Sequence, residues 1–215
     1  MAALEGHLHI SQKIWEWAKE NLTKEEIKNK LLLATNYGGR TVWHVAAERG
    51  NLAVIEKLRG WAEEKLTKEE IKNDLLLATD ELGETVWHMA ALEGHLDISQ
   101  KIWEWAEKNL TKEEIKNKLL LATNKRGRTV LRVAEQRGNL AVMENLREWA
   151  EENQTQGKVK SIYLLTKVCK GKTDWHVAAE RGKKAVLEKK QELTEGNLTK
   201  EEIKNKFYAH GTVHT

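Results

Sequence analysis

The chain has 215 residues, of which 40% are hydrophobic and 32% are charged, and its net charge is +3. This composition is typical of a folded protein rather than a disordered one, and no run of apolar residues is long enough to predict a membrane-spanning helix. The single cysteine cannot form an internal disulfide and favours a reducing compartment, so we expect a cytoplasmic or nuclear protein. Proline is absent, so glycines and N-capping residues must mark where elements end.

Charge is distributed unevenly along the chain. Residues 1–124 carry 17 basic and 21 acidic residues, whereas residues 125–215 carry 19 and 12. The basic second half suits an acidic partner, which would be a protein segment, a nucleic acid or a phospholipid surface. The alternative is that these lysines and arginines are ordinary solvated residues on helix faces.

A 44-residue period runs through the sequence. The segment Thr41-Val-Trp-His44 recurs unchanged at residues 85–88 and, in divergent forms, as Thr-Val-Leu-Arg at residues 129–132 and Thr-Asp-Trp-His at residues 173–176. Residues 1–36 also match residues 89–124 at all but three positions, which indicates the duplication of a two-unit block. A fixed period of this length predicts an array in which neighbouring units bury each other's apolar faces.

The first two helices of each unit can be predicted from residues 41–65. Thr41 is a good N-cap for a helix over Val42 to Arg49, and Gly50 is a natural left-handed stop. A second helix begins at Leu52, because apolar residues recur from there at steps of three and four.

A third helix is predicted by the segment Thr67-Lys-Glu-Glu70, which has the pattern of a capping box. This helix is expected over about Lys68 to Ala78, with extended chain as the alternative for residues 75–78. We therefore expect an all-α repeat solenoid with about three helices per 44-residue repeat and short hairpin loops. The expected array comprises a partial first repeat (1–36), three repeats (37–80, 81–124 and 125–168) and a divergent last repeat with a tail (169–215).

The pattern Asn36-x-x-Gly39-x-Thr41-Val-Trp-His44-x-Ala46-Ala47-x-x-Gly50 resembles the ankyrin repeat, whose pattern opens Asp-x-x-Gly-x-Thr-Pro-Leu-His-x-Ala-Ala-x-x-Gly. The resemblance covers about residues 36–193. It implies antiparallel helix pairs joined by outward-pointing hairpins, and a protein-binding scaffold rather than an enzyme, without cofactor or metal. This sequence departs from the family in having Val-Trp for Pro-Leu, and in a period about 11 residues longer, which is the length of the third helix.

In ankyrin repeats the residues at the hairpin tip and at the end of the first helix often contact the partner. Carried onto this chain, the positions predicted to bind a partner are Tyr37, Arg40, Arg49, Leu82, Glu84, Leu92, Lys125, Arg126, Arg128, Arg137, Lys170 and Lys172. Since the last six are basic, our leading hypothesis is a protein partner with an acidic or phosphorylated segment. The alternatives are nucleic-acid or acidic-ligand binding by the basic half, and a decayed fragment of a longer ankyrin array.

The repeated histidines and tryptophans are predicted to be structural. His44, His88 and His176 hold the structural histidine position of the ankyrin pattern, and successive units lie roughly 10 Å apart, too far to share a metal whose ligands lie about 2 Å away. The core is expected to contain Trp17, Trp43, Trp61, Trp87, Trp105, Trp149 and Trp175. Partial exposure is expected for Trp15 and Trp103, which lie on the other side of their helices, where each indole would stack on a neighbour or bind a partner.

Both ends of the array are expected to expose apolar residues, because the sequence shows no polar capping repeat. These residues are Ile10, Ile14, Phe207 and Tyr208. Uncapped apolar ends predict self-association.

Overall fold

The computed structural model describes residues 8–152. The chain divides into two units, residues 1–153 and 154–215, and the described residues belong to the first. Every regular element in residues 8–152 is a helix, and the extended pairing there is limited to two isolated bridges, between Thr35 and Thr41 and between Thr79 and Thr85. The prediction of an all-α fold is confirmed for this part of the chain.

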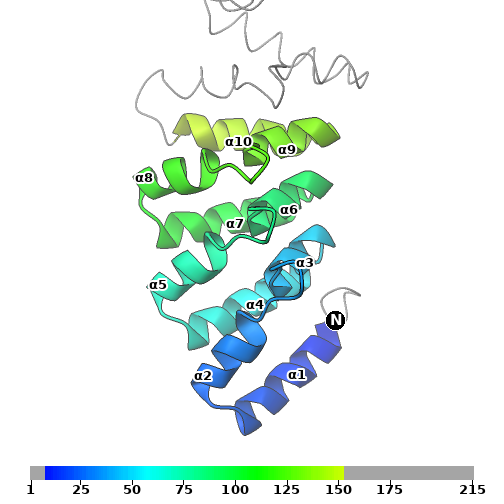
Figure 1. The fold of residues 1–215 in the computed structure, drawn as a ribbon, viewed down its shortest axis with the longest axis vertical. Helices are drawn as coiled ribbons and strands as arrows, with labels where there is room; N and C mark the ends of the chain where they lie inside the picture. The colour runs from blue at the N-terminus through cyan, green and yellow to red at the C-terminus, as the bar shows by residue number, and fades with distance from the viewer. Residues whose placement is uncertain (1–7, 153–215) are drawn as a thin grey trace, which may run out of the picture. The chain divides into compact units, whose positions relative to one another are not determined.

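Three kinds of helix recur in chain order (Figure 1). The short first helices are α3 (Val42–Glu48), α6 (Val86–Glu93) and α9 (Val130–Arg137). The longer second helices are α1 (Leu8–Asn21), α4 (Leu52–Lys65), α7 (Leu96–Asn109) and α10 (Leu140–Glu152). The third helices begin as α2 (Lys24–Ile27), α5 (Lys68–Glu70) and α8 (Lys112–Glu114), and continue as the π-helical segments η1 (Lys28–Leu32), η2 (Ile71–Leu76) and η3 (Ile115–Leu120).

The third helix begins at the predicted capping box and ends in a widened turn. The Thr67 hydroxyl accepts from the amide of Glu70, and the Glu70 carboxylate accepts from the amide of Thr67 at 2.8 Å. At the other end the amide of Leu77 donates to the carbonyl of Lys72, five residues back, at 3.0 Å, which is the π-helical pattern. Helical structure therefore continues through Leu76, and the extended alternative for this residue is wrong.

Successive first helices pack side by side, and so do successive second helices. α6 contacts both α3 and α9, and α4 contacts both α1 and α7 (Figure 1). Pairs of alanines, including Ala46, Ala47, Ala90 and Ala91, are fully buried in the first helices. Small side chains allow helix axes to approach closely, so α6 is covered by a first helix on both sides. Among the described residues, no helix has the length and apolar character needed to cross a membrane.

Two tryptophans that the sequence predicts to be partly exposed are buried. Trp15 stacks on Trp61 with ring centroids 4.6 Å apart, and Trp103 stacks on Trp149 at 5.1 Å. The expected exposure was wrong because an indole of the next unit covers each ring, Trp61 of α4 for Trp15 and Trp149 of α10 for Trp103. In α7, which has a second helix on each side, both Trp103 and Trp105 are buried although they point to opposite sides of the helix.

Trp17 is 57% exposed, whereas the sequence predicts a core position for it. Its equivalent Trp105 is buried, because it stacks on Trp43 of the preceding unit with ring centroids 5.2 Å apart. Among residues 8–152, no aromatic ring stacks on Trp17. The core assignments of Trp43, Trp87 and Trp105 are confirmed.

Candidate partner-binding surface

The three described hairpin loops share one turn that is organised by an Asn or Asp side chain. The Oδ1 atom of Asp80 accepts from the amides of Leu82 and Glu84, at 2.8 and 2.9 Å. Asn36 and Asn124 make the same pair of bonds in their own loops. Because the side chain replaces a turn of backbone hydrogen bonds, the loop has a fixed shape that the local sequence determines.

Main-chain hydrogen bonds hold the loops in register with one another. The amide of Glu81 donates to the carbonyl of Gly38 at 3.0 Å, and the amide of Lys125 donates to the carbonyl of Leu82 at 2.9 Å. Gly83 has a φ of +73°, and a Cβ atom on it would lie 2.9 Å from the amide nitrogen of Lys125. Glycine is therefore required there both by its own conformation and by the approach of the next loop.

The outermost tip positions form an exposed row of predicted contact residues. Tyr37 is fully exposed, Leu82 is 40% exposed, and Lys125 and Arg126 are exposed as well. Because the loops are in register, these side chains come from successive loops of one edge. The row begins with an aromatic residue and ends with two cations.

The residue directly after the loop glycine is charged in all three loops, as Arg40, Glu84 and Arg128, and its side chain interacts within the protein. Arg40 donates through Nε to Asp80 at 3.1 Å and through a guanidinium nitrogen to Glu48 at 3.1 Å. Arg128 bonds Glu84 at 3.2 Å and Gln136 at 2.8 Å. These arginines therefore connect a loop to the first helix of the same unit and to a neighbouring loop.

Glu84 is a buried structural residue, although the sequence places it among the partner-binding residues. It is 3% exposed, and its carboxylate accepts from Arg128 at 3.2 Å and from the amide side chain of Asn124 at 3.0 Å. A carboxylate at this depth is stabilised because the guanidinium of Arg128 neutralises its charge and Asn124 donates a hydrogen bond to it. The structure thus gives Glu84 an internal role in place of an exposed contact.

The remaining predicted contact residues lie at the ends of the first helices. Arg49 and Arg137 are exposed, Leu92 is half-buried, and Arg137 lies 3.5 Å from Glu93 of the preceding unit. The predicted contacts at 170 and 172 (Lys170 and Lys172) lie outside the described residues. The structure therefore collects the described members of the predicted set along one edge, apart from Glu84.

The histidine of the first helix connects successive units. His44 is fully buried, with Nδ1 2.9 Å from the hydroxyl of Thr41 and Nε2 3.1 Å from the carbonyl of Glu84. Because a carbonyl oxygen only accepts, Nε2 carries the proton and Nδ1 accepts from the threonine. The ring is then neutral and joins its own helix start to the next loop.

His88 repeats this arrangement one unit later. Its Nδ1 lies 2.8 Å from the hydroxyl of Thr85, and its Nε2 lies 3.3 Å from the carbonyl of Arg128. Burial lowers the pKa of His88 to about 4 and also lowers the pKa of His44. These contacts support the predicted structural role of the repeated histidine.

The structure shows two kinds of contact between units that the sequence did not predict. The residue after the helix-ending glycine reaches back to the preceding unit, where His95 Nε2 donates to the carbonyl of Glu48 at 3.2 Å. Lysines of the third helices bond glutamates one unit later, from Lys28 to Glu70 at 2.6 Å and from Lys72 to Glu114 at 2.7 Å. For the lysine–glutamate pairs the available signal was that both residue types recur at the 44-residue spacing, whereas the position of His95 is asparagine in the neighbouring units, at Asn51 and Asn139.

No group of three or more His, Cys, Asp or Glu side chains within residues 8–152 is arranged to hold a metal ion. Comparison of the sequence with models of known protein families finds no match, and comparison with curated proteins finds none either.

Proposed function

We propose that this protein is an ankyrin-like repeat solenoid that serves as a protein-binding scaffold. Its partner is a protein with an acidic segment, which binds the loop tips and the adjoining ends of the first helices. The proposal extends to residues 153–215 on the sequence pattern alone.

The observation that carries the proposal is the row of exposed tip residues held in register by main-chain bonds. A surface that is rigid before binding loses little conformational entropy on association, which favours recognition. Its cationic end, at Lys125 and Arg126, would attract carboxylates or phosphates over a distance of several ångströms.

Charge reversal at the tip tests the proposal. We would replace Lys125 and Arg126 together by glutamate and titrate a labelled peptide of alternating glutamate and serine by fluorescence anisotropy. Arg128 is left intact, because a glutamate there would face the buried carboxylate of Glu84 and destabilise the fold. We expect the variant to bind the peptide roughly tenfold more weakly or worse.

The matched control makes the same change in net charge at the starts of two third helices, away from the loop tips. Lys68 and Lys112 are exposed first residues of third helices, where glutamate is favoured by the helix dipole. The Lys68→Glu/Lys112→Glu variant should bind the peptide as the original protein does. Equal affinity of all three proteins would refute the proposal. Tighter, steeply salt-dependent binding to an arbitrary DNA duplex would replace it with nucleic-acid binding.

A further inference from the structure

The three described loop tips present different chemistry at one equivalent position. Tyr37, Glu81 and Lys125 hold this position, and all three side chains are exposed. The position that follows adds Leu82, which is 40% exposed, and Arg126, which is exposed as well. In chain order the tips therefore offer an aromatic ring, then a carboxylate beside an apolar side chain, and then two cations. A segment lying along the row meets these three environments in a fixed order.

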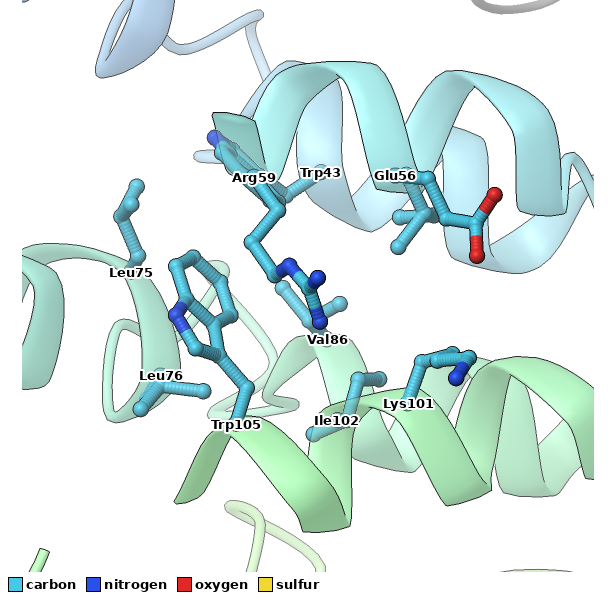
Figure 2. A pocket seen from close by; sticks show the side chains of 10 residues that line it. Trp43, Glu56, Arg59, Leu75, Leu76, Val86, Lys101, Ile102 and Trp105 are labelled. Atoms are coloured by element: carbon cyan, nitrogen blue, oxygen red, sulfur yellow. The ribbon is translucent and has the colours of Figure 1, made fainter. Parts of the chain in front are cut away.

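The distance between successive tips is set by the packing of the helices beneath them. The helix α6 contacts both α3 and α9, and helices in contact lie roughly 10 Å apart. This packing leaves little free space, because the cavity between two units that is lined by Trp43, Val86 and Trp105 has a volume of only about 20 Å³ (Figure 2). The main-chain bonds between loops, at 3.0 and 2.9 Å, carry the same spacing to the tips. Equivalent tip residues therefore follow one another at roughly 10 Å.

A polyproline II helix has a repeat that matches this spacing. It has three residues per turn and rises about 3.1 Å per residue, so every third side chain returns to one face after about 9 Å. A β-strand does not match, since residues three apart on a strand point to opposite faces. The amides of Glu81 and Lys125 already donate within the row and are not available to an added strand. Aromatic side chains such as that of Tyr37 are the surfaces on which polyproline II segments dock.

Charge determines which residue of the segment faces each loop. The carboxylate of Glu81 repels an acidic residue at the middle tip, where Leu82 favours an apolar one. Lys125 and Arg126 favour a carboxylate or phosphate one turn further along. At the other end, the ring of Tyr37 favours proline. The order of the three tips thus selects an order of residue types in the partner.

We propose that the loop tips bind a polyproline II segment of a partner protein, in which a proline, an apolar residue and an acidic residue follow one another at intervals of three. The proline lies on Tyr37, the apolar residue on Leu82, and the acidic residue beside Lys125 and Arg126. This inference rests on the proposed function, because it gives the acidic segment of the partner a conformation and a spacing. A segment that is merely acidic would have neither.

Two peptides of equal composition and charge test the order. Pro-Ser-Pro-Leu-Ser-Pro-Glu has the expected order, and Pro-Ser-Pro-Glu-Ser-Pro-Leu places its glutamate opposite Glu81. Both are amidated, so that the glutamate is their one carboxylate, and both are titrated with the full chain by fluorescence anisotropy. The reversed sequences are measured too, because a polyproline II helix presents every third residue in either direction, and the direction that binds more tightly is compared. The expected order should bind roughly tenfold more tightly than the exchanged order.

Replacing the middle tip should alter this preference. Glu81→Lys removes the repulsion at the centre of the row, so the exchanged peptide should gain affinity and the tenfold difference should disappear. Tyr37→Ala should weaken binding of the expected peptide several-fold. The matched control is Glu107→Lys, at an exposed position of α7 where α1 carries Lys19. It makes the same change in net charge and should leave the preference between the two peptides intact.

The inference is overturned if the original protein binds both peptides equally, or if Glu81→Lys and Glu107→Lys have the same effect. It is also overturned if a helical peptide with the same three residues seven apart, a repeat of about 10.5 Å, binds more tightly, because the partner segment is then an α-helix. The proposed function survives each of these results, provided that the glutamate–serine peptide still binds through Lys125 and Arg126. Failure of that peptide as well would refute both.

Discussion

The indole of Trp105 stacks on the indole of Trp43 with the ring planes 26° apart, so a side chain of α7 is covered by a side chain of α3. Trp17 holds the same position in α1 and is 57% exposed. We expect Trp105→Ala to lower the free energy of unfolding by roughly 3–5 kcal/mol, as for other buried aromatic residues, and Trp17→Ala to change it by less than about 1 kcal/mol. Urea denaturation of both variants measures this. Equal losses would contradict the exposure of Trp17.

The burial of His88 should lower the free energy of unfolding in mild acid. Its pKa is lowered by burial to about 4 in the folded protein, whereas an unfolded chain has the ordinary value of 6.5. The unfolded state therefore binds more protons between these values, and the contribution of His88 is complete above pH 6.5 and is lost as the pH falls to 4. The loss attributable to this residue is of the order of 3 kcal/mol.

Urea denaturation between pH 7.5 and pH 4 measures this loss. A His88→Gln variant, which cannot titrate, should be less stable at neutral pH but should show a shallower decline. Parallel stability curves for the two proteins would mean that His88 is not the titrating group.

Two glycines should respond to alanine in opposite directions. Gly83 has a φ of +73° and no room for a Cβ atom beside the next loop, so Gly83→Ala should cost roughly 1–3 kcal/mol. Gly60 lies inside α4, where a Cβ atom would meet no other atom within 4 Å. Gly60→Ala should stabilise the protein by about 1 kcal/mol through helix propensity. Thermal denaturation distinguishes the two signs, and a stable Gly83→Ala protein would be inconsistent with the loop register.

The lysine–glutamate contacts between third helices should lower the pKa of the glutamate carboxyl group. Lys72 lies 2.7 Å from Glu114 of the next unit and is the main cause that lowers the pKa of this glutamate to about 2. Lys118 bonds the same carboxylate at 3.2 Å and contributes less. In an NMR titration of the side-chain carboxyl carbons, Lys72→Gln should raise the pKa of Glu114 more than Lys118→Gln does. The reverse order would place the main interaction within one helix instead of between two units.

Local features of the sequence predicted the helices well. Thr41 and Thr67 cap helices at the expected places, and the second helix starts at Leu52 as expected. These boundaries depend on hydrogen bonds between residues three or four apart, which the sequence displays directly. The end of the third helix at Leu76 was less certain, because an i→i+5 turn has no sequence signature that separates it from an extended segment.

Burial at the unit interfaces could not be predicted from single helices. Trp103 is buried because Trp149 lies against it, and Glu84 is buried because Arg128 and Asn124 come from the next loop. Each partner is 40 to 46 residues away, so helical periodicity within one element contains no information about it. Superimposing the units at the 44-residue spacing shows which residue types recur, but the contacts between them become visible only in the packed structure.

The loops are connected through atoms that nearly every amino acid possesses, the amides of Glu81 and Lys125 and the carbonyls of Gly38 and Leu82. Positions 37, 81 and 125 can therefore accept any side chain but proline, provided that the glycines at 39, 83 and 127 are kept. A combinatorial library randomised at these tips should consist largely of folded members, so new target specificities could be selected without redesigning the helices beneath.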